Sequence, residues 1–373
     1  MRNISEVTKG VVPELLNFLN AGVYITDANR TIVFWNRMAE EITGYKAEQV
    51  LGKCCKDNLL VHEDKEGNPL CTTEMCPLYQ SMKKGVPTEA PVLVFAKTAS
   101  GERIPVSTAV APIHDSDGKV IGGVEVFRDE RENVAQMELA RAVQRQMLAA
   151  VKPRSEHISF ALRYSPLEVV GGDFYHAAPV SDDVYAVFIA DVMGHGPSAA
   201  LYTAMLHSVV MECDGMRGYP GAFVSAVNDR LCERVPQTVF VTAAAATLSA
   251  SEGSLTYCSA GHPQALLQPA GSELPEVLDC GNFPLGIEKG AHFRAREFSI
   301  ARGDRFLLYT DGVTEIRVGQ EERLGVEGLV AVVAECPPEG PQHGLDRLFD
   351  LLMARNVVPF QEDDITLLSC IVL

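Results

Sequence analysis

Four aspartates in the second half of the chain share one sequence context, in which an acid lies beside an apolar run and usually next to glycine. They are Asp173 in VVGGDFY, Asp191 in FIADVMGHG, Asp311 in LLYTDGVTE and Asp363 in EDDITLLSC. A carboxylate at the end of a buried strand is costly to desolvate unless something pairs with it, and no lysine or arginine adjoins any of the four. We therefore expect the fold to gather these strand ends around hard divalent cations. For any single aspartate, a helix cap or a turn residue is the alternative role.

The ions that suit such acids are Mg²⁺ and Mn²⁺, which prefer oxygen ligands in octahedral geometry and keep several waters. A few carboxylates and a backbone carbonyl can hold two such ions about 3.5–4 Å apart around one shared water, which becomes a nucleophile. Glycines beside the acids let the backbone approach the ions and leave room for a phosphate.

Composition limits the possible partners. The chain has 373 residues and a formal net charge of −17, and without basic stripes this argues against a nucleic-acid partner. No apolar stretch approaches the ~20 residues that cross a bilayer, and the N-terminus lacks the apolar core of a signal peptide. We therefore expect a cytoplasmic protein of two or three domains with no nucleic-acid and no membrane partner.

Residues 11–128 are predicted to form a small α+β domain with an antiparallel sheet. Period-two alternation and β-branched residues predict strands over 90–98, 103–115 and 120–129, separated by the turn signals ASGE and SDGK. The shorter segments GVYITD and TIVFWN precede a helical RMAEEITGY.

Residues 129–152 lack glycine and proline and are rich in helix formers, which predicts a linker helix. Ala140, Val143, Met147 and Ala150 recur at spacings of three and four, as in the seam of a short coiled coil. The alternative is an ordinary amphipathic helix packed on its own domain. Because the helix joins two domains, the pattern favours a dimerising or signal-transmitting role.

Residues 153–373 form the predicted second domain, in which apolar strands recur with helical runs between some of them. Strands are expected in ISFALRYSP, VYAVFIAD, VFVTAAAATLSA, SLTYCSAG, QALLQPA, RFLLYTDG and ITLLSCIVL, and helices in SAALYTAMLHSVVMECD, PGAFVSAVNDRLCERV and GLDRLFDLLMARN. Many strands and a few long helices predict sheets sandwiched between helical layers.

The ordered motifs VVGGDFY, ADVMGHGPSAAL, SAGHPQALL, FPLGI, GDRFLLYTDGVTE and DDITLL resemble the bacterial metal-dependent serine/threonine phosphatases of the sporulation-phosphatase type, relatives of the PP2C phosphatases. The resemblance covers about residues 150–373 and implies an αββα sandwich that binds two Mn²⁺ or Mg²⁺ ions. The implied ligand candidates are Asp173, Asp191, the carbonyl of Val192, Asp311, Asp363 and Asp364. Asp363 is preferred to Asp364 because the DD pair matches an acid followed by Asn in the wider PP2C group.

Other polar residues near these motifs have less definite roles. His195 could give a proton to the leaving oxygen, since its unperturbed pKa is near neutral; the alternative is a turn or helix-start residue that bonds the backbone. His176 stands where the family often has an acid, which puts an outer metal contact there in doubt. Arg163 is the candidate found for a phosphate clamp, and His262 in SAGHPQ is expected to be structural.

Residues 11–128 resemble a PAS sensor domain, with NAGVYITDANRTIVFWNRMAEEITGY and GKVIGGVEVFRD as its opening and closing elements. The resemblance implies a ligand or cofactor between sheet and helices, and a signal passed through the following helix. Together with the second domain, the expected fold class is α+β: a PAS-like antiparallel sheet, a helical linker and an αββα phosphatase domain.

Four cysteines and one histidine fall close together in this first domain. The cysteines are Cys54, Cys55, Cys71 and Cys76, with His62 between them. Thiolates are soft ligands, so an iron–sulfur cluster, Zn²⁺ and a redox-switched disulfide are all compatible with them, as are plain structural cysteines. The spacing matches neither the common zinc patterns nor a ferredoxin run. A flavin pocket, or a haem pocket with His62 as axial ligand, also stays open.

The resemblance implies a signal-regulated protein serine/threonine phosphatase that acts on a small phosphorylated anti-sigma-factor antagonist. A ligand or redox change in the sensor would alter how the linker helices pack in a homodimer, and this would bias assembly of the metal site. The alternative is a catalytically silent phosphatase fold that only binds a partner. The intact set of four acids favours the enzyme.

Overall fold

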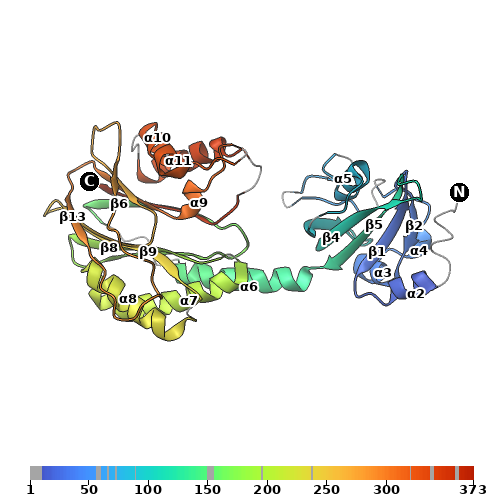
Figure 1. Cartoon of the computed structure of the whole chain (residues 1–373), viewed down its shortest axis with the longest axis horizontal. Coiled ribbons are helices and arrows are strands. Elements are labelled where there is room, and N and C mark those ends of the chain that lie inside the picture. Colours follow the sequence, from blue (N-terminus) through green and yellow to red (C-terminus); the bar gives the residue numbers. More distant parts are fainter. Residues whose placement is uncertain are drawn as a thin grey trace. The chain divides into compact units, whose positions relative to one another are not determined.

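The computed structural model describes residues 11–55, 60–64, 67–71, 74–88, 90–148, 155–194, 196–236, 238–319, 321–336, 340–357 and 361–373 (Figure 1). The chain divides into two compact units, residues 1–136 and 137–373. The division lies inside α6 (Arg131–Leu148), the helix predicted as the linker over 129–152. No helix in the described ranges is long and apolar enough to cross a bilayer.

The first unit is built on a five-stranded antiparallel sheet with the strand order β2-β1-β5-β4-β3. Its strands are β1 (Gly22–Asp27), β2 (Ile32–Trp35), β3 (Val92–Lys97), β4 (Arg103–His114) and β5 (Val120–Asp129). Its helices are α2 (Val11–Asn17), α3 (Arg37–Thr43), α4 (Ala47–Val50) and α5 (Pro77–Lys84). The long strands follow the alternation in the sequence, and the predicted antiparallel sheet is confirmed.

Asn36 shows how local sequence fixes a helix start in this unit. Its Oδ1 accepts the backbone amides of Val23 and Ala39, each at 2.8 Å, and its Nδ2 donates to the carbonyl of Ala21 at 2.9 Å. The cap therefore ties the first turn of α3 to β1. The helix ends at Gly44, whose φ of 76° suits glycine.

The second unit contains two five-stranded sheets, ordered β13-β10-β9-β8-β7 and β12-β11-β14-β15-β6. The strands are β6 (Ile158–Ser165), β7 (Asp173–Pro179), β8 (Val184–Val192), β9 (Val241–Ser249), β10 (Ser254–Ala260), β11 (Ala265–Gln268), β12 (Glu276–Leu278), β13 (Arg296–Ser299), β14 (Arg305–Tyr309) and β15 (Ile365–Val372). The helices are α7 (Gly196–Cys213), the short 3₁₀ helix η1 (Asp214–Met216), α8 (Pro220–Arg234), α9 (Asp311–Thr314), α10 (Gly325–Ala334) and α11 (Pro341–Arg355).

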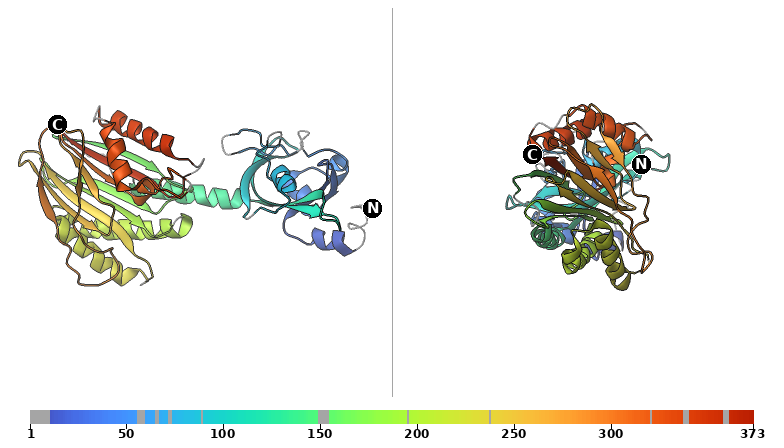
Figure 2. Two further views of the ribbon diagram at one scale, coloured as in Figure 1. Left: turned by 45° about the horizontal axis from the view of Figure 1, so that its top comes forward. Right: turned by 90° about the vertical axis from the view of Figure 1, so that its left-hand side faces the viewer.

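Helices cover the outer faces of both sheets of this unit (Figures 1 and 2). Helices α7 and α8 lie on the β7–β8–β9 side, whereas α10 and α11 lie on the β6–β15 side. Strands β8 and β9 are buried almost throughout, because one face meets the other sheet and the opposite face meets helices. The predicted αββα sandwich is confirmed.

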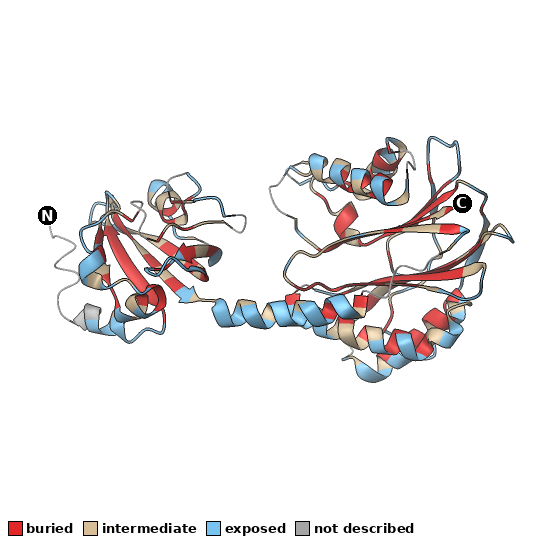
Figure 3. Ribbon diagram, turned by 180° about the vertical axis from the view of Figure 1, so that it is seen from behind, coloured by how far each residue is buried: buried red, intermediate tan, exposed pale blue. Residues whose placement is uncertain are grey.

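Helix α6 is exposed along most of its length (Figure 3). Leu139 and Val143 are 69% and 47% exposed, whereas Gln144 and Leu148 are buried. Of the predicted coiled-coil seam, Ala140 and Val143 are exposed, Met147 is half-buried and Ala150 lies outside the described residues. The C-terminal part of α6 therefore packs on the second unit, and an apolar stripe is left at the surface.

Candidate active site

Each sheet of the second unit supplies two of the four aspartates singled out in the sequence. Asp173 begins β7 and lies directly opposite Asp191 of β8 in the strand register. Asp311 begins α9 immediately after β14, and Asp363 lies just before β15. Since β14 and β15 are neighbours in the second sheet, the sandwich brings the two pairs of acids to one edge.

Asp173 is the most buried of the four and links the two sheets. Its Oδ2 accepts hydrogen bonds from Thr310 Oγ1 at 2.9 Å and Thr366 Oγ1 at 2.5 Å, both from the opposite sheet. Its Oδ1 is buried and has no hydrogen-bond partner among the described residues. One oxygen is thus held in place while the other is left for a ligand. Sequence reasoning missed both threonines, because their partner lies far away in the chain.

The charges of this acid cluster repel one another. Burial raises the pKa of Asp173 well above its ordinary value, and the charge of Asp191 adds to the shift. Burial, followed by the charges of Asp311 and Asp363, raises the pKa of Asp191 to about 8. Burial and the charge of Asp363 raise the pKa of Asp311 to about 6. None of the four acids forms an ion pair with lysine or arginine in the described ranges, so no side-chain cation there offsets their repulsion.

A glycine positions the loop just before Asp173, which contains Gly171 and Gly172 and is called the glycine loop below. A Cβ added to Gly172 would lie 2.8 Å from the carbonyl oxygen of Val192 and 3.1 Å from that of Gly194. Only glycine therefore lets this loop approach the end of β8 so closely. The carbonyl of Val192, which the sequence proposes as a ligand, lies next to the loop as a result.

The two acids of the DD pair have different surroundings. The carboxylate of Asp364 is buried and accepts the amides of Leu167 and Gly172, both at 2.6 Å. Asp363 is half-buried, and its Oδ1 accepts the amide of Asp364 at 2.8 Å. Asp364 thus holds the loop before Asp173, and its charge also acts on Asp173 and Asp191. The charge of Asp363 acts on Asp191 and Asp311.

Helix α6 also forms hydrogen bonds with the glycine loop. Gln144 donates through Nε2 to the carbonyl of Gly171 at 2.6 Å and accepts the amide of Gly171 at 3.2 Å through Oε1. Thr203 of α7 donates to the carbonyl of Gly172 at 3.0 Å. The backbone just before Asp173 is therefore fixed by two helices as well as by Asp364.

Replacing Gln144 by leucine should weaken the metal site without unfolding the protein. The loop loses two hydrogen bonds, so we expect the Mn²⁺ concentration for half-maximal phosphatase activity to rise about 10-fold, as for residues that position metal ligands. A Mn²⁺ titration of phosphate release measures the change. Gln146→Leu, an exposed glutamine on the same helix, is the matched control. Equal titration curves for the two variants would contradict a role for Gln144.

The remaining site candidates lie elsewhere or outside the description. His195 lies outside the described residues. Arg163 contacts α11, with its guanidinium 4.4 Å from the ring centre of Phe349 and 3.7 Å from Asp346, so it offers no phosphate clamp beside the acids. Burial lowers the pKa of His176 to about 4 and that of His262 to about 3, which keeps both rings neutral.

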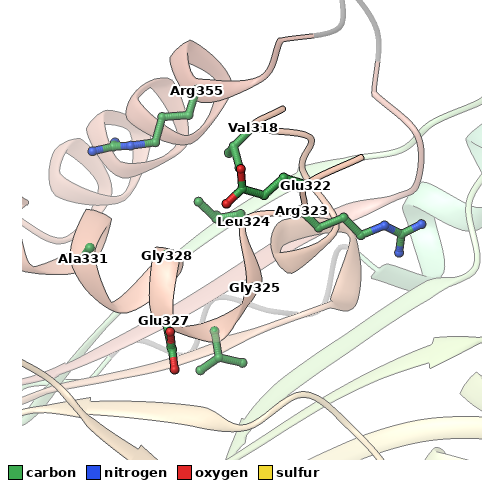
Figure 4. Close-up of a pocket in the computed structure, with 10 residues that line it drawn as sticks. Val318, Glu322, Arg323, Leu324, Gly325, Glu327, Gly328, Ala331 and Arg355 are labelled. Atoms are coloured by element: carbon green, nitrogen blue, oxygen red, sulfur yellow. The ribbon is translucent and has the colours of Figure 1, made fainter. Parts of the chain in front are cut away.

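A cavity of about 810 Å³ lies beside the start of α10 (Figure 4). It is lined by the segment 322–328 together with Val318, Ala331 and Arg355. Arg323 on its rim pairs with Glu315 at 2.5 Å, and the charge of Glu315 adds to the raised pKa of Asp311. Glu315 therefore connects the rim of the cavity with the surroundings of Asp311.

The acids are oxygen donors of the kind that hard cations prefer, but their side chains are not yet arranged around one metal position. Within the part of the chain that the structure describes, no three acid, imidazole or thiol groups already close around one point. The donors are oxygens only, and one buried oxygen of Asp173 has no hydrogen-bond partner in the described ranges. The pKa values are raised by burial and then by mutual repulsion, and a cation would offset both.

The fold and the acid cluster define the class, a PP2C-type serine/threonine protein phosphatase with a PAS domain before it. The chain belongs to the stage II sporulation protein E (SpoIIE) family, whose sequence model matches residues 181–372. Residues 20–132 match the model of a PAS domain. Both resemblances predicted from the sequence are therefore confirmed.

Individual relatives agree with this assignment. The chain is 26% identical to the phosphoserine phosphatase RsbU of Bacillus subtilis (strain 168) over 242 residues, which are 64% of this chain and 70% of RsbU. It is 29% identical to the phosphoserine phosphatase RsbP of the same organism over 185 residues, 48% of this chain and 45% of RsbP. The SiaA-PP2C domain of Pseudomonas aeruginosa has the same fold, with a TM-score of 0.57 at 20% identity over 65% of this chain and 98% of that domain.

Proposed function

We propose that the protein is a metal-dependent phosphatase that hydrolyses phosphoserine or phosphothreonine on a partner protein, under control of its PAS domain. The observation that carries this proposal is the acid cluster: four aspartates from two sheets meet at one edge, repel one another and have no cationic partner in the described ranges. Such a site gains most from divalent cations.

The residues of the acid cluster would have different roles in this reaction. Asp173, Asp191, the carbonyl of Val192, Asp311 and Asp363 would hold two Mn²⁺ or Mg²⁺ ions. When bound, such ions activate a water for in-line attack on phosphorus and neutralise the phosphoryl oxygens. Thr310 and Thr366 fix the orientation of Asp173 through one oxygen, which leaves the other for an ion. We assign Asp364 to holding the loop, and proton donation by His195 stays a prediction.

The substrate that we infer is a small phosphorylated protein of the anti-sigma-factor antagonist type. RsbU and RsbP are phosphoserine phosphatases, and the resemblance of the motifs points to the same substrate class. The cavity beside Arg323 gives room for the segment that flanks the phosphorylated residue.

The regulatory part of the proposal places two copies of α6 against each other in a homodimer. Ala140 and Val143 of the predicted seam are exposed, and so is Leu139, one turn before Val143. Exposed apolar side chains at this spacing suit a short coiled coil. Gln144 follows on the same helix and contacts the loop before Asp173. A change in the packing of α6 would therefore reach the acid cluster through one side chain.

The competing function is a catalytically silent binding module. Incubation of the full chain with a phosphoserine-bearing antagonist protein and Mn²⁺ separates the two. The proposal expects release of inorganic phosphate that stops when EDTA removes the metal and resumes when Mn²⁺ is restored. Tight binding of the phosphoprotein without phosphate release would favour the silent module.

A further inference from the structure

A second group of metal-ligating side chains is buried in the first unit, away from the acid cluster. Cys55, His62, Cys71 and Cys76 are each at most 6% exposed. They come from different segments: Cys55 follows the bridge between Thr31 and Cys54, and Cys76 is the N-cap of α5. The fold therefore brings together side chains that are spread out in the sequence.

Cys54 does not join this group, although the sequence places it among the candidate ligands. It is only half-buried, and its Sγ donates to the carbonyl of Asn29 at 3.6 Å. Consecutive residues in extended backbone point to opposite sides, so Cys55 faces the interior while Cys54 faces away. His62 takes the fourth place.

The four side chains contact one another and the backbone. The amide of His62 donates to Cys71 Sγ at 3.2 Å. The Cys71 and Cys76 thiols are close enough to shift each other's pKa, and the backbone at Tyr79 contributes to the lowered pKa of Cys76. Cys76 also interacts electrostatically with His62 and with Cys55. Burial raises the pKa of Cys55 to about 12, and Cys76 together with burial raises the pKa of Cys71, whereas the pKa of Cys76 is lowered to about 6, chiefly by Cys71. A metal that binds here therefore displaces protons from Cys55 and Cys71.

Glu125 provides an independent sign of a ligand. It is 1% exposed, and its Oε2 accepts the hydroxyl of Tyr24 at 2.5 Å. Its Oε1 has no hydrogen-bond partner among the described residues and lies 3.6 Å from Nε2 of His62. A carboxylate behind one ring nitrogen fixes the tautomer and orients the other nitrogen towards a metal.

We propose that Cys55, His62, Cys71 and Cys76 bind one Zn²⁺ ion in the PAS domain, with Glu125 as the positioning residue behind His62. Three thiolates and one imidazole are a common ligand set of structural zinc. In the described residues no three potential ligands already surround one point, so zinc binding requires rotation of these side chains. Each thiol that is protonated beforehand releases its proton when the sulfur–zinc bond forms.

The ion would fasten α5 to the rest of the domain. Cys76 begins this helix, and α5 packs tightly on β5, where a Cβ on Gly123 would lie 2.7 Å from Leu78. A disulfide between Cys71 and Cys76 would leave Cys55 and His62 without a role, whereas a zinc ion uses all four side chains. The donor chemistry therefore favours the ion.

Elemental analysis of the full chain, purified without chelator and dialysed, tests the proposal. We expect one zinc per chain, retained in Cys54→Ser and in Asp191→Asn, and lost in Cys76→Ser. Asp191→Asn separates this ion from any ion in the phosphatase domain. Co²⁺ added to apo wild-type protein should give the ligand-field and sulfur-to-cobalt bands of tetrahedral thiolate coordination, a readout that needs no variant to fold.

Three results would overturn the proposal. The first is folded wild-type protein that holds no zinc and shows no thiolate bands with Co²⁺. The second is loss of zinc in Cys54→Ser while circular dichroism stays unchanged. The third is iron with acid-labile sulfide in place of zinc, which would assign an iron–sulfur cluster instead.

Discussion

Asp191→Asn is expected to abolish metal-dependent phosphate release, with kcat falling by at least about 10²-fold. The amide keeps the shape of the side chain but removes the negative charge that faces Asp173 across β7 and β8 and that interacts with Asp311 and Asp363. With one charge fewer, the acid cluster holds divalent cations less strongly. Phosphate release from a phosphoserine protein, measured over a range of Mn²⁺ concentrations, gives both kcat and the metal requirement.

The matched control is Asp182→Asn, an exposed aspartate in the turn between the same two strands. It makes the same chemical change away from the cluster, so its kcat should equal that of wild type. If Asp191→Asn retained wild-type kcat at saturating Mn²⁺, the acid cluster would not be the catalytic site.

The metal-free phosphatase domain should lose stability as the pH rises from about 4 to about 8. The pKa of Asp191 is raised to about 8 and that of Asp311 to about 6, above the unfolded value of about 4. A raised folded-state pKa means that the contribution to stability is complete below the unfolded pKa and is lost as the pH rises through the folded pKa. Mn²⁺ or Mg²⁺ should offset the loss by replacing the protons.

The difference between Asp191→Asn and wild type isolates this effect from other titrating groups, such as His176 and His262. We would measure the melting temperature of this domain by calorimetry in EDTA at pH 5 and at pH 8. The melting temperature of the variant minus that of wild type should be higher at pH 8 than at pH 5, by on the order of 5 °C. Saturating Mn²⁺ should reverse the order, because only wild type binds the ion well. A difference that stays constant with pH in EDTA would show that Asp191 is ionised throughout.

The sequence predicted the strands with a clear apolar or alternating pattern, but not β7, which carries Asp173, nor the short β12 and β13. Alternation predicted β4 and β5, and the almost wholly apolar runs predicted β8 and β9, because burial on one face or on two leaves different patterns. It did not predict α10, whose sequence GVEGLVAVVA contains glycines and β-branched residues that disfavour a helix in isolation. Packing of Leu329 and Val332 into the core stabilises that helix.

The sequence by itself predicted the domain families and the αββα class through the resemblance of its ordered motifs. It also singled out the four acids, because an acid beside an apolar run and a glycine can be recognised within a single segment. Only the tertiary structure decided how they work together. It separated Asp363 from Asp364, since the carboxylate of Asp364 accepts amides from a distant loop. It showed that His62, and not Cys54, is buried with the other three cysteines of the first unit. It also showed that Gln144 donates a hydrogen bond to the glycine loop. Each of these facts depends on contacts between segments far apart in the chain, where local sequence carries no signal.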